Sequence, residues 1–335
     1  MRSYHLSHSG AGLAGLTVRT HDAPVPGPGQ ALVAVRATSL SHRELLVLEG
    51  SYVLPVKPDV VPVSDGAGEV VALGPGVEGP AVGDRVMATL FGVEHLAQRG
   101  GSLDGMLTEL AVVDADSLVP VPAHLSYEEA ATLPCVAVTA WNALTGDAAG
   151  VRPGDTVVVQ GSGGVSLFAL GFAKALGARV IATTGGPGKA VRLRGLGADE
   201  VIDYRATPDW AAEVRRLTSG RGADRVVDVA GILHDSVRAV ALAGTIACVG
   251  FVGRTAEPLD PRALFASGAT VRAVAVGSRA QFTAMNEVIA EHGLRPVIDR
   301  VFPFEDAPGA YAYYAGGTSF GKVVIQGAGS PAGIG

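Results

Sequence analysis

The sequence predicts an α/β protein of two domains, one rich in β-strands and one built on a doubly wound parallel sheet. Its 335 residues exceed what a single hydrophobic core usually supports. From residue 30 to about residue 122, short apolar runs are separated by proline and glycine, which is typical of an irregular β-rich domain. From residue 153 onward, strand and helix patterns alternate instead. We therefore assign residues 1–125 and 278–335 to the β-rich domain and residues 126–277 to the parallel-sheet domain.

The composition excludes several classes of function. Hydrophobic residues make up 48% of the chain and charged residues 17%, so a globular protein is expected rather than a disordered one. Lysine and arginine number 26 against 32 acidic residues, without a block of like charge, which predicts neither a nucleic-acid partner nor a membrane partner. Cys135 and Cys248 stand far apart, so we expect no disulfide framework, no cysteine-based zinc module and a cytoplasmic location.

A helix is expected at the crossing between the two domains. Ser126 stands at the N-cap position, and Glu129 follows three residues later, which completes a capping box. This pattern predicts a helix that starts at residue 127.

Six apolar strands define the second domain. Runs that are apolar on both faces and alternate with helices indicate a parallel sheet covered on both sides, with right-handed crossovers. A helix over residues 166–177 is expected to end on Gly177. After a last helix around residues 279–292, the strand at 320–326 is expected to pair back into the first domain. The six predicted strands cover residues 156–160, 179–184, 200–203, 225–230, 245–250 and 270–276.

A glycine-rich turn directly after the first of these strands predicts a dinucleotide site. Glycines there let the chain turn tightly and approach a pyrophosphate, while the N-terminus of the following helix offers backbone N–H donors. Ser166 stands where the usual pattern has its third glycine, and it is small enough for close helix–strand packing. The predicted cofactor-binding residues of this turn are Gly161, Ser162, Gly163, Gly164 and Val165.

The end of the second strand favours NADPH over NADH. An NAD site usually places a carboxylate there to hold the ribose 2′-hydroxyl. Thr183 and Thr184 stand there instead, and Lys189 and Arg192 follow, a set better suited to a 2′-phosphate. We therefore predict NADPH as the cofactor, and NADH remains open.

Several motifs spread over the chain resemble those of the medium-chain dehydrogenase/reductase superfamily. The resemblance implies a GroES-like β-rich catalytic domain, a Rossmann domain and nicotinamide-dependent oxidoreductase activity. The motifs are VVPVSDGAGEVV at 60–71, VGDRV at 82–86, AATLP at 130–134, TAW at 139–141, LGAD at 196–199, IDY at 202–204 and FGKVV at 320–324.

The residues that match the superfamily's catalytic zinc ligands predict a protein without zinc. Those positions hold Ser41, Ser64 and Cys135, and two hydroxyls are poor zinc ligands. Asp65 stands where a zinc enzyme usually carries a glutamate, and residues 91–121 contain none of the four cysteines of a structural zinc lobe. The chain is most similar to the zinc-free branch that includes quinone oxidoreductases and enoyl-thioester reductases.

The resemblance also implies further cofactor contacts and an oligomeric state. Tyr204 is expected against the adenosine phosphate, which supports NADPH. A homodimer is expected through the apolar segment at 270–276. The other residues implied to line the cofactor are Thr139, Gly250, Phe251, Val252, Phe320 and Lys322.

Two residues are candidate proton donors for a reduction in which the nicotinamide supplies the hydride. Tyr52 matches the tyrosine that enoyl-thioester reductases of this branch use, and His42 can donate a proton or hold a substrate oxygen. The leading hypothesis is a reductase of an activated C=C or of a carbonyl in a small-molecule substrate such as a quinone or enone. Two alternatives stay open: an alcohol or aldehyde oxidoreductase without metal, and a cofactor-binding protein with little or no turnover.

Overall fold

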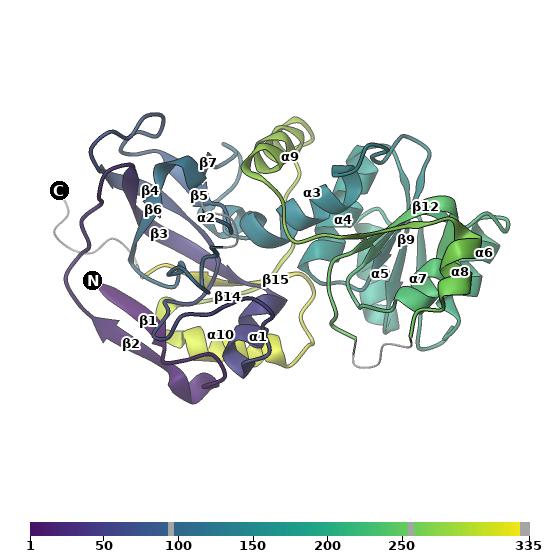
Figure 1. Cartoon of the computed structure of the whole chain (residues 1–335), viewed down its shortest axis with the longest axis horizontal. Helices are drawn as coiled ribbons and strands as arrows, with labels where there is room; N and C mark the ends of the chain where they lie inside the picture. The colour runs from purple at the N-terminus through teal and green to yellow at the C-terminus, as the bar shows by residue number, and fades with distance from the viewer. Residues whose placement is uncertain (93–96, 254–257, 329–335) are drawn as a thin grey trace. The chain divides into compact units, whose positions relative to one another are not determined.

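Two compact units make up the fold in the computed structural model, which describes residues 1–92, 97–253 and 258–328. The first unit contains Met1–Cys135 and Ser278–Gly335, and the second contains Val136–Gly277. The first unit therefore extends ten residues beyond the expected residue 125. The additional segment includes helix α2 (Tyr127–Ala130), which packs against strands β3 and β4 of the first unit (Figure 1).

The second unit is built on a six-stranded parallel sheet, as the sequence predicts. The strand order β10-β9-β8-β11-β12-β13 places the first strand in the middle, so the chain winds outward in both directions. Three of the predicted strands match the structure residue for residue, and the other three differ at their ends. The strands are β8 (Thr156–Gln160), β9 (Arg179–Thr184), β10 (Glu200–Asp203), β11 (Ala223–Asp228), β12 (Val240–Cys248) and β13 (Thr270–Ala273).

Helices separate these strands along the chain. Helix α4 follows the glycine-rich turn and buries an apolar stripe, in which Phe172 stacks on Phe168 and meets Trp141 of α3 edge-on. The helices of this unit are α3 (Val138–Thr145), α4 (Gly164–Ala175), α5 (Pro187–Gly195), α6 (Trp210–Leu217), α7 (Leu233–Ala239) and α8 (Pro261–Ser267).

The first unit contains a mixed seven-stranded sheet and a separate two-stranded hairpin. The predicted return of the C-terminal strand is confirmed: β15 pairs antiparallel with β3, with Val323 opposite Leu40. The strands are β1 (Arg2–Leu6), β2 (Leu16–Thr20), β3 (Gln30–Leu40), β4 (Asp65–Leu73), β5 (Arg85–Ala88), β6 (Leu110–Asp114), β7 (Leu118–Pro120), β14 (Ile298–Phe302) and β15 (Lys322–Gln326).

Three longer helices complete the first unit: α1 (His42–Glu49), α9 (Arg279–Glu291) and α10 (Ala307–Ala315). The predicted capping box at Ser126 and Glu129 is present at the start of α2. Short 3₁₀ helices occupy Leu13–Gly15, Ala115–Ser117 and Phe304–Asp306, and one π-helical turn covers Leu133–Ala137, where the chain passes from the first unit to the second.

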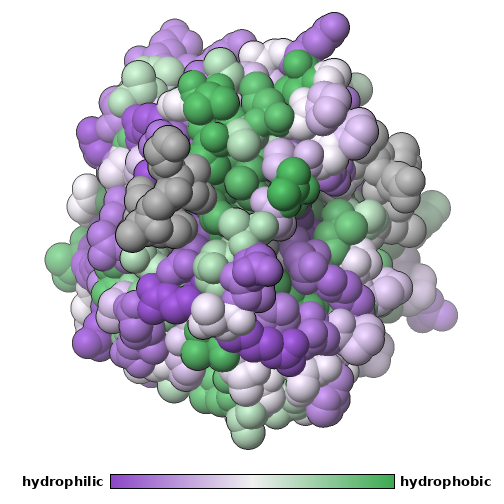
Figure 2. All heavy atoms as spheres, turned by 90° about the vertical axis from the view of Figure 1, so that its left-hand side faces the viewer, coloured by the Kyte–Doolittle hydropathy of each residue, from purple (hydrophilic) through white to green (hydrophobic). Residues whose placement is uncertain are grey.

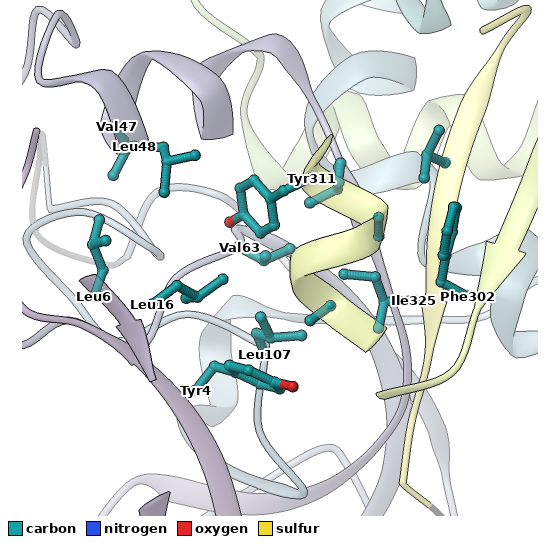
Figure 3. Close-up of a cluster of buried hydrophobic side chains, with 14 of the residues drawn as sticks. Tyr4, Leu6, Leu16, Val47, Leu48, Val63, Leu107, Phe302, Tyr311 and Ile325 are labelled. Atoms are coloured by element: carbon teal, nitrogen blue, oxygen red, sulfur yellow. The ribbon is translucent and has the colours of Figure 1, made fainter. Parts of the chain in front are cut away.

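A hydrophobic core joins the hairpin, α1, α10 and the C-terminal strands of the first unit. Tyr311 of α10 is 1% exposed and points toward Val63, close to Leu48 of α1 (Figure 3). Figure 2 shows one outer face of the molecule, where hydrophobic side chains gather in the upper half and hydrophilic ones in the lower half. Within the described residues, no helix has both the length and the apolar character needed to cross a membrane.

Candidate functional site

The glycine-rich turn lies between the end of β8 and the first turn of α4. Gly161 has a φ of 77°, a left-handed conformation that favours glycine, and its N–H donates to the Thr183 carbonyl at 2.8 Å. Gly163 is the N-cap of α4. At both glycines, the point where a Cβ would sit has no described atom within 4 Å. The turn therefore leaves open space in front of a helix N-terminus, which fits a dinucleotide pyrophosphate.

Ser166 has a structural role that its sequence position only partly indicates. Its buried hydroxyl donates to the Gln160 carbonyl at 2.5 Å and so closes the first turn of α4 against the end of β8. The serine thus adds a hydrogen bond at a position where the usual glycine supplies only close packing.

The second predicted phosphate-binding position lies at the ends of β9 and β10. Thr183 and Thr184 are buried, and the Tyr204 N–H donates to the Thr184 carbonyl at 3.0 Å. A Cβ added at Gly185 would lie 2.5 Å from the Tyr204 hydroxyl and 3.0 Å from Nε of Arg205. The structure therefore brings a phenol and a guanidinium together beside Gly185, directly after the two threonines of β9. Sequence analysis missed Arg205, although its place directly after Tyr204 could have indicated it.

The other predicted cofactor residues occupy different places in the two units. The segment after β12 contains Gly250, Phe251 and Val252. It lies at the carboxyl ends of the parallel strands, where dinucleotides bind in such folds. Thr139 is buried in α3, and Lys189 lies in the first turns of α5, so both belong to the second unit. Phe320 and Lys322 are buried in the first unit.

A buried polar network that sequence analysis also missed supports this edge of the sheet. Asp228, at the end of β11, accepts hydrogen bonds from the Ser236 hydroxyl at 2.9 Å and from the Gly231 N–H at 2.7 Å. The Gln160 amide donates to Ser236 at 3.1 Å. Burial raises the pKa of Asp228, and these hydrogen bonds oppose that effect. The network fixes the loop after β11 beside the glycine-rich turn.

In the first unit, a buried lysine binds the residues at the junction of β3 and α1. The Lys322 ammonium donates to the Leu40 carbonyl at 2.6 Å and to Ser41 Oγ at 2.9 Å. Ser41 donates in turn to Asp65 Oδ2 at 3.2 Å, and the Lys322 nitrogen lies 3.6 Å from that oxygen. Ser41 is the N-cap of α1, but its side chain makes no capping hydrogen bond because these two residues engage it.

A second ion pair completes this buried cluster. Arg43 lies 2.7 Å from Glu44, whose same oxygen accepts from the Ser64 N–H at 3.2 Å. The Ser64 hydroxyl lies 3.0 Å from Glu44 Oε1 and 3.1 Å from Asp65 Oδ1. Two cations, Lys322 and Arg43, thus balance two carboxylates. We name Ser41, Arg43, Glu44, Ser64, Asp65 and Lys322 the serine–lysine cluster.

Burial governs the ionisation of two groups in and beside this cluster. It raises the pKa of Asp65 to about 6, although Lys322 lowers that pKa. It also raises the pKa of the neighbouring Cys135 thiol to about 12, and the charge of Asp65 adds to this effect. Cys135 is therefore held as a neutral thiol at neutral pH.

The two candidate proton donors differ in their partners. The Tyr52 hydroxyl donates to Gln98 Oε1 at 2.8 Å and accepts from Arg43 Nε at 3.3 Å. His42 is half-buried at the first position of α1, and burial lowers its pKa, which Glu49 partly offsets. Both residues belong to the first unit, and their catalytic roles remain predictions.

Two family descriptions match the chain, one for each kind of domain. Residues 27–123 match the alcohol dehydrogenase GroES-like domain, and residues 164–291 match the zinc-binding dehydrogenase family. The zinc-type alcohol dehydrogenase-like protein C1773.06c of Schizosaccharomyces pombe is 40% identical over 318 residues, covering 89% of this chain and 91% of that protein. The chain belongs to the medium-chain dehydrogenase/reductase superfamily.

Other members of the superfamily are similar over nearly the whole chain. The acryloyl-coenzyme A reductase of Metallosphaera sedula is 30% identical, covering 93% of this chain and 96% of that protein. A solved NAD-dependent alcohol dehydrogenase gives a TM-score of 0.90 at 35% identity, covering 97% and 99% of the two chains. Mycobacterial Rv1454c, solved in complex with NADPH, gives 0.83 at 28% identity, covering 97% and 100%. The chain is therefore an NAD(P)-dependent oxidoreductase of this superfamily.

The donors at the superfamily's catalytic zinc position do not fit a zinc ion. Ser41 and Ser64 offer hydroxyls, which zinc sites rarely use, and Cys135 is the one thiol at the three positions. The Lys322 ammonium lies 2.9 Å from Ser41 Oγ, so a positive charge already adjoins the first of these donors. In the parts of the chain that the structure describes, no group of three or more histidine, cysteine or acidic residues could hold a metal.

The buried pair of Lys322 and Asp65 gives a stability prediction. Lys322→Met leaves the Asp65 carboxylate without its cation, and breaking a buried pair in this way costs about 3–5 kcal/mol. We expect that loss in the free energy of unfolding, measured by urea denaturation at pH 7.5. Adding Asp65→Asn removes the unpaired charge and should recover most of the loss. Equal stability of Lys322→Met and the natural protein would contradict the role of this pair.

Proposed function

We propose that this chain is a zinc-independent, NADPH-dependent reductase that transfers a hydride to an activated C=C or to a carbonyl, in a quinone- or enone-like small molecule. The observation that carries the proposal is the serine–lysine cluster, which replaces zinc ligands with hydroxyls around a lysine ammonium. Without a metal to polarise a carbonyl oxygen, the reaction depends on a substrate whose double bond is already activated. The similarity to an acryloyl-coenzyme A reductase supports this substrate class.

The residues at the ends of β9 and β10 support NADPH as the cofactor. Thr183 and Thr184 supply hydroxyls where an NAD site usually has a carboxylate, and Arg205 adds a guanidinium beside Gly185. Guanidinium groups bind phosphate oxygens through charge-assisted hydrogen bonds, which a ribose hydroxyl cannot match. A similar protein was solved in complex with NADPH.

When bound, the cofactor supplies the hydride, and the protein must supply the proton. Tyr52 and His42 are the candidate donors. The Tyr52 hydroxyl already has a cation beside it, since Arg43 Nε donates to its oxygen, and this cation offsets the negative charge that proton transfer leaves there. Burial lowers the pKa of His42, which favours the neutral imidazole, so His42 is better suited to hold a substrate oxygen through its ring N–H than to give up a proton.

A metal-free alcohol or aldehyde oxidoreductase is the second candidate function. The names of two similar proteins, a zinc-type alcohol dehydrogenase-like protein and an NAD-dependent alcohol dehydrogenase, favour it. In this case His42 would accept the alcohol proton that zinc enzymes release from a metal-bound oxygen.

The edge strand β13 supports a homodimer, in which two copies pair their sheets at this edge. The strand is the last of the parallel sheet and has no further partner within the described residues. Sedimentation equilibrium at micromolar concentration should give twice the mass of one chain, and a single-chain mass would contradict the pairing of two sheets.

The two cysteines support a cytoplasmic location. The buried thiol of Cys135 and the unpaired Cys248 are in keeping with a reducing compartment.

The activity is tested with the purified protein, NADPH and a panel of enones, quinones, enoyl thioesters, aldehydes and alcohols, by following nicotinamide absorbance. We expect turnover with the activated acceptors and less than twofold loss after exhaustive dialysis against a strong chelator. Zinc at one equivalent per chain, together with loss of activity on chelation, would contradict zinc independence.

The same assay assigns the proton donor. Tyr52→Phe and His42→Ala each remove one candidate, and loss of a general acid lowers kcat by about 100-fold or more. Turnover of alcohols that depends on His42 alone would favour the second candidate function. Binding of NADPH without turnover of any acceptor would contradict both.

The cofactor preference is tested at Arg205. Arg205→Gln removes the guanidinium beside Gly185, and we expect the Kd for NADPH to rise by about tenfold while that for NADH changes less than twofold. Arg194→Gln is the matched control, because it removes the same charge near the other end of α5. Equal losses for the two cofactors would contradict a 2′-phosphate contact.

A further inference from the structure

The Tyr52 hydroxyl lies between two buried polar side chains that the proposed reaction does not yet explain. Gln98 is fully buried, and Arg43 is 7% exposed. Tyr52 itself belongs to a loop after α1, where both neighbours, Ser51 and Val53, are exposed. The Tyr52 ring packs against the core of the first unit, whereas its hydroxyl takes its direction from these two polar side chains.

The hydrogen bonds fix the direction in which the Tyr52 proton points. Gln98 Nε2 donates to the Pro55 carbonyl at 3.1 Å, so its Oε1 is the atom that faces Tyr52. An amide oxygen can only accept, and the phenol therefore donates its proton to Gln98 at 2.8 Å. Arg43 Nε can only donate, so the Tyr52 oxygen accepts from it at 3.3 Å.

Arg43 also fixes the aromatic ring. Its guanidinium carbon lies 4.8 Å from the centre of the Tyr52 ring, within the range of a cation–π contact. The guanidinium is held in turn by Glu44 at 2.7 Å and by the Gly100 carbonyl at 3.2 Å. The ring and the hydroxyl of Tyr52 are thus held from two sides.

We propose that Gln98 is a positioning residue for the reduction, because its Oε1 fixes the Tyr52 hydroxyl until the phenol proton turns from Gln98 to a bound substrate. The proposal rests on the proposed function and on Tyr52 as the proton donor. In the reaction the O–H bond of Tyr52 breaks and its proton goes to the anion that hydride transfer from NADPH creates. Water then returns a proton to the phenolate beside Arg43.

The kinetic test is a double-mutant cycle. Gln98→Met keeps the length of the side chain and removes the acceptor, and we expect kcat to fall about five- to tenfold with less than twofold change in the Kd for NADPH. In the Tyr52→Phe background the same substitution should cause no further loss, since Gln98 acts through the phenol. Gln326→Met, at an exposed glutamine of β15, is the matched control and should leave kcat unchanged.

Three kinetic results would overturn the proposal. Gln98→Met could lower kcat equally with and without the Tyr52→Phe substitution, or it could leave kcat unchanged in the protein that keeps Tyr52. The third result is a Tyr52→Phe protein with unchanged kcat. A spectroscopic measurement separates the proposal from the proposed function. With tyrosine labelled by ¹³C at Cζ, the Tyr52 signal, assigned by its loss in Tyr52→Phe, should shift in Gln98→Met and not in Gln326→Met. An unshifted signal overturns the proposal, whereas absence of turnover in the natural protein overturns the proposed function.

Discussion

The buried ammonium of Lys322 is the interaction on which the candidate catalytic unit depends. Lys322 begins β15, close to the C-terminus, and its nitrogen reaches the Leu40 carbonyl at the end of β3. Through Ser41 and Asp65 it also connects the start of α1 with the start of β4. Three segments far apart in sequence therefore converge on one charge. A buried charge is tolerated only when it is paired and hydrogen-bonded, so these segments must meet in this register.

The ion pairs of the serine–lysine cluster also determine which hydrogen bonds the neighbouring side chains can make. Because Ser41 accepts from Lys322 and donates to Asp65, it is not available to cap α1. Because Glu44 is paired with Arg43, the guanidinium stays fixed and can hold Tyr52. The stability of the cluster and the placement of the candidate proton donor are thus coupled through adjacent residues of α1.

The parallel sheet could be predicted closely from sequence, and the reasons are local. Runs such as those of β8 and β9 are apolar on both faces and are bounded by glycine and by helix caps. A few consecutive residues therefore determine where each strand begins and ends. The glycine-rich turn is equally local, because its function depends on missing side chains and on the adjacent helix.

Other features could not be predicted because they depend on residues distant in sequence. Helix α1 has a mixed pattern in which Arg43 and Glu44 are buried, and only their pairing makes that burial possible. Gln98 is an ordinary polar residue until the fold brings it to Tyr52, 46 positions away. Lys322 was expected at the cofactor from resemblance, and its observed partners in the first unit lie 281 and 282 positions away. Contacts between residues so far apart leave no repeating pattern of apolar and polar residues in the sequence.

In the proposed zinc-independent reaction, the hydroxyls at the zinc-ligand positions have a chemical consequence for the class of substrate. A zinc ion stabilises negative charge on an oxygen directly, and this lets an alcohol lose its proton near neutral pH. The Lys322 ammonium cannot replace that function, because Leu40 and Ser41 take its hydrogen bonds and Asp65 offsets its charge. The remaining stabilisation must come from the substrate and from a proton donor. An activated C=C spreads the negative charge left by hydride addition over a conjugated carbonyl. Its reduction therefore requires less stabilisation of negative charge by the protein than the reduction of a simple ketone does. On this argument the chemistry of the cluster favours conjugate reduction over alcohol oxidation.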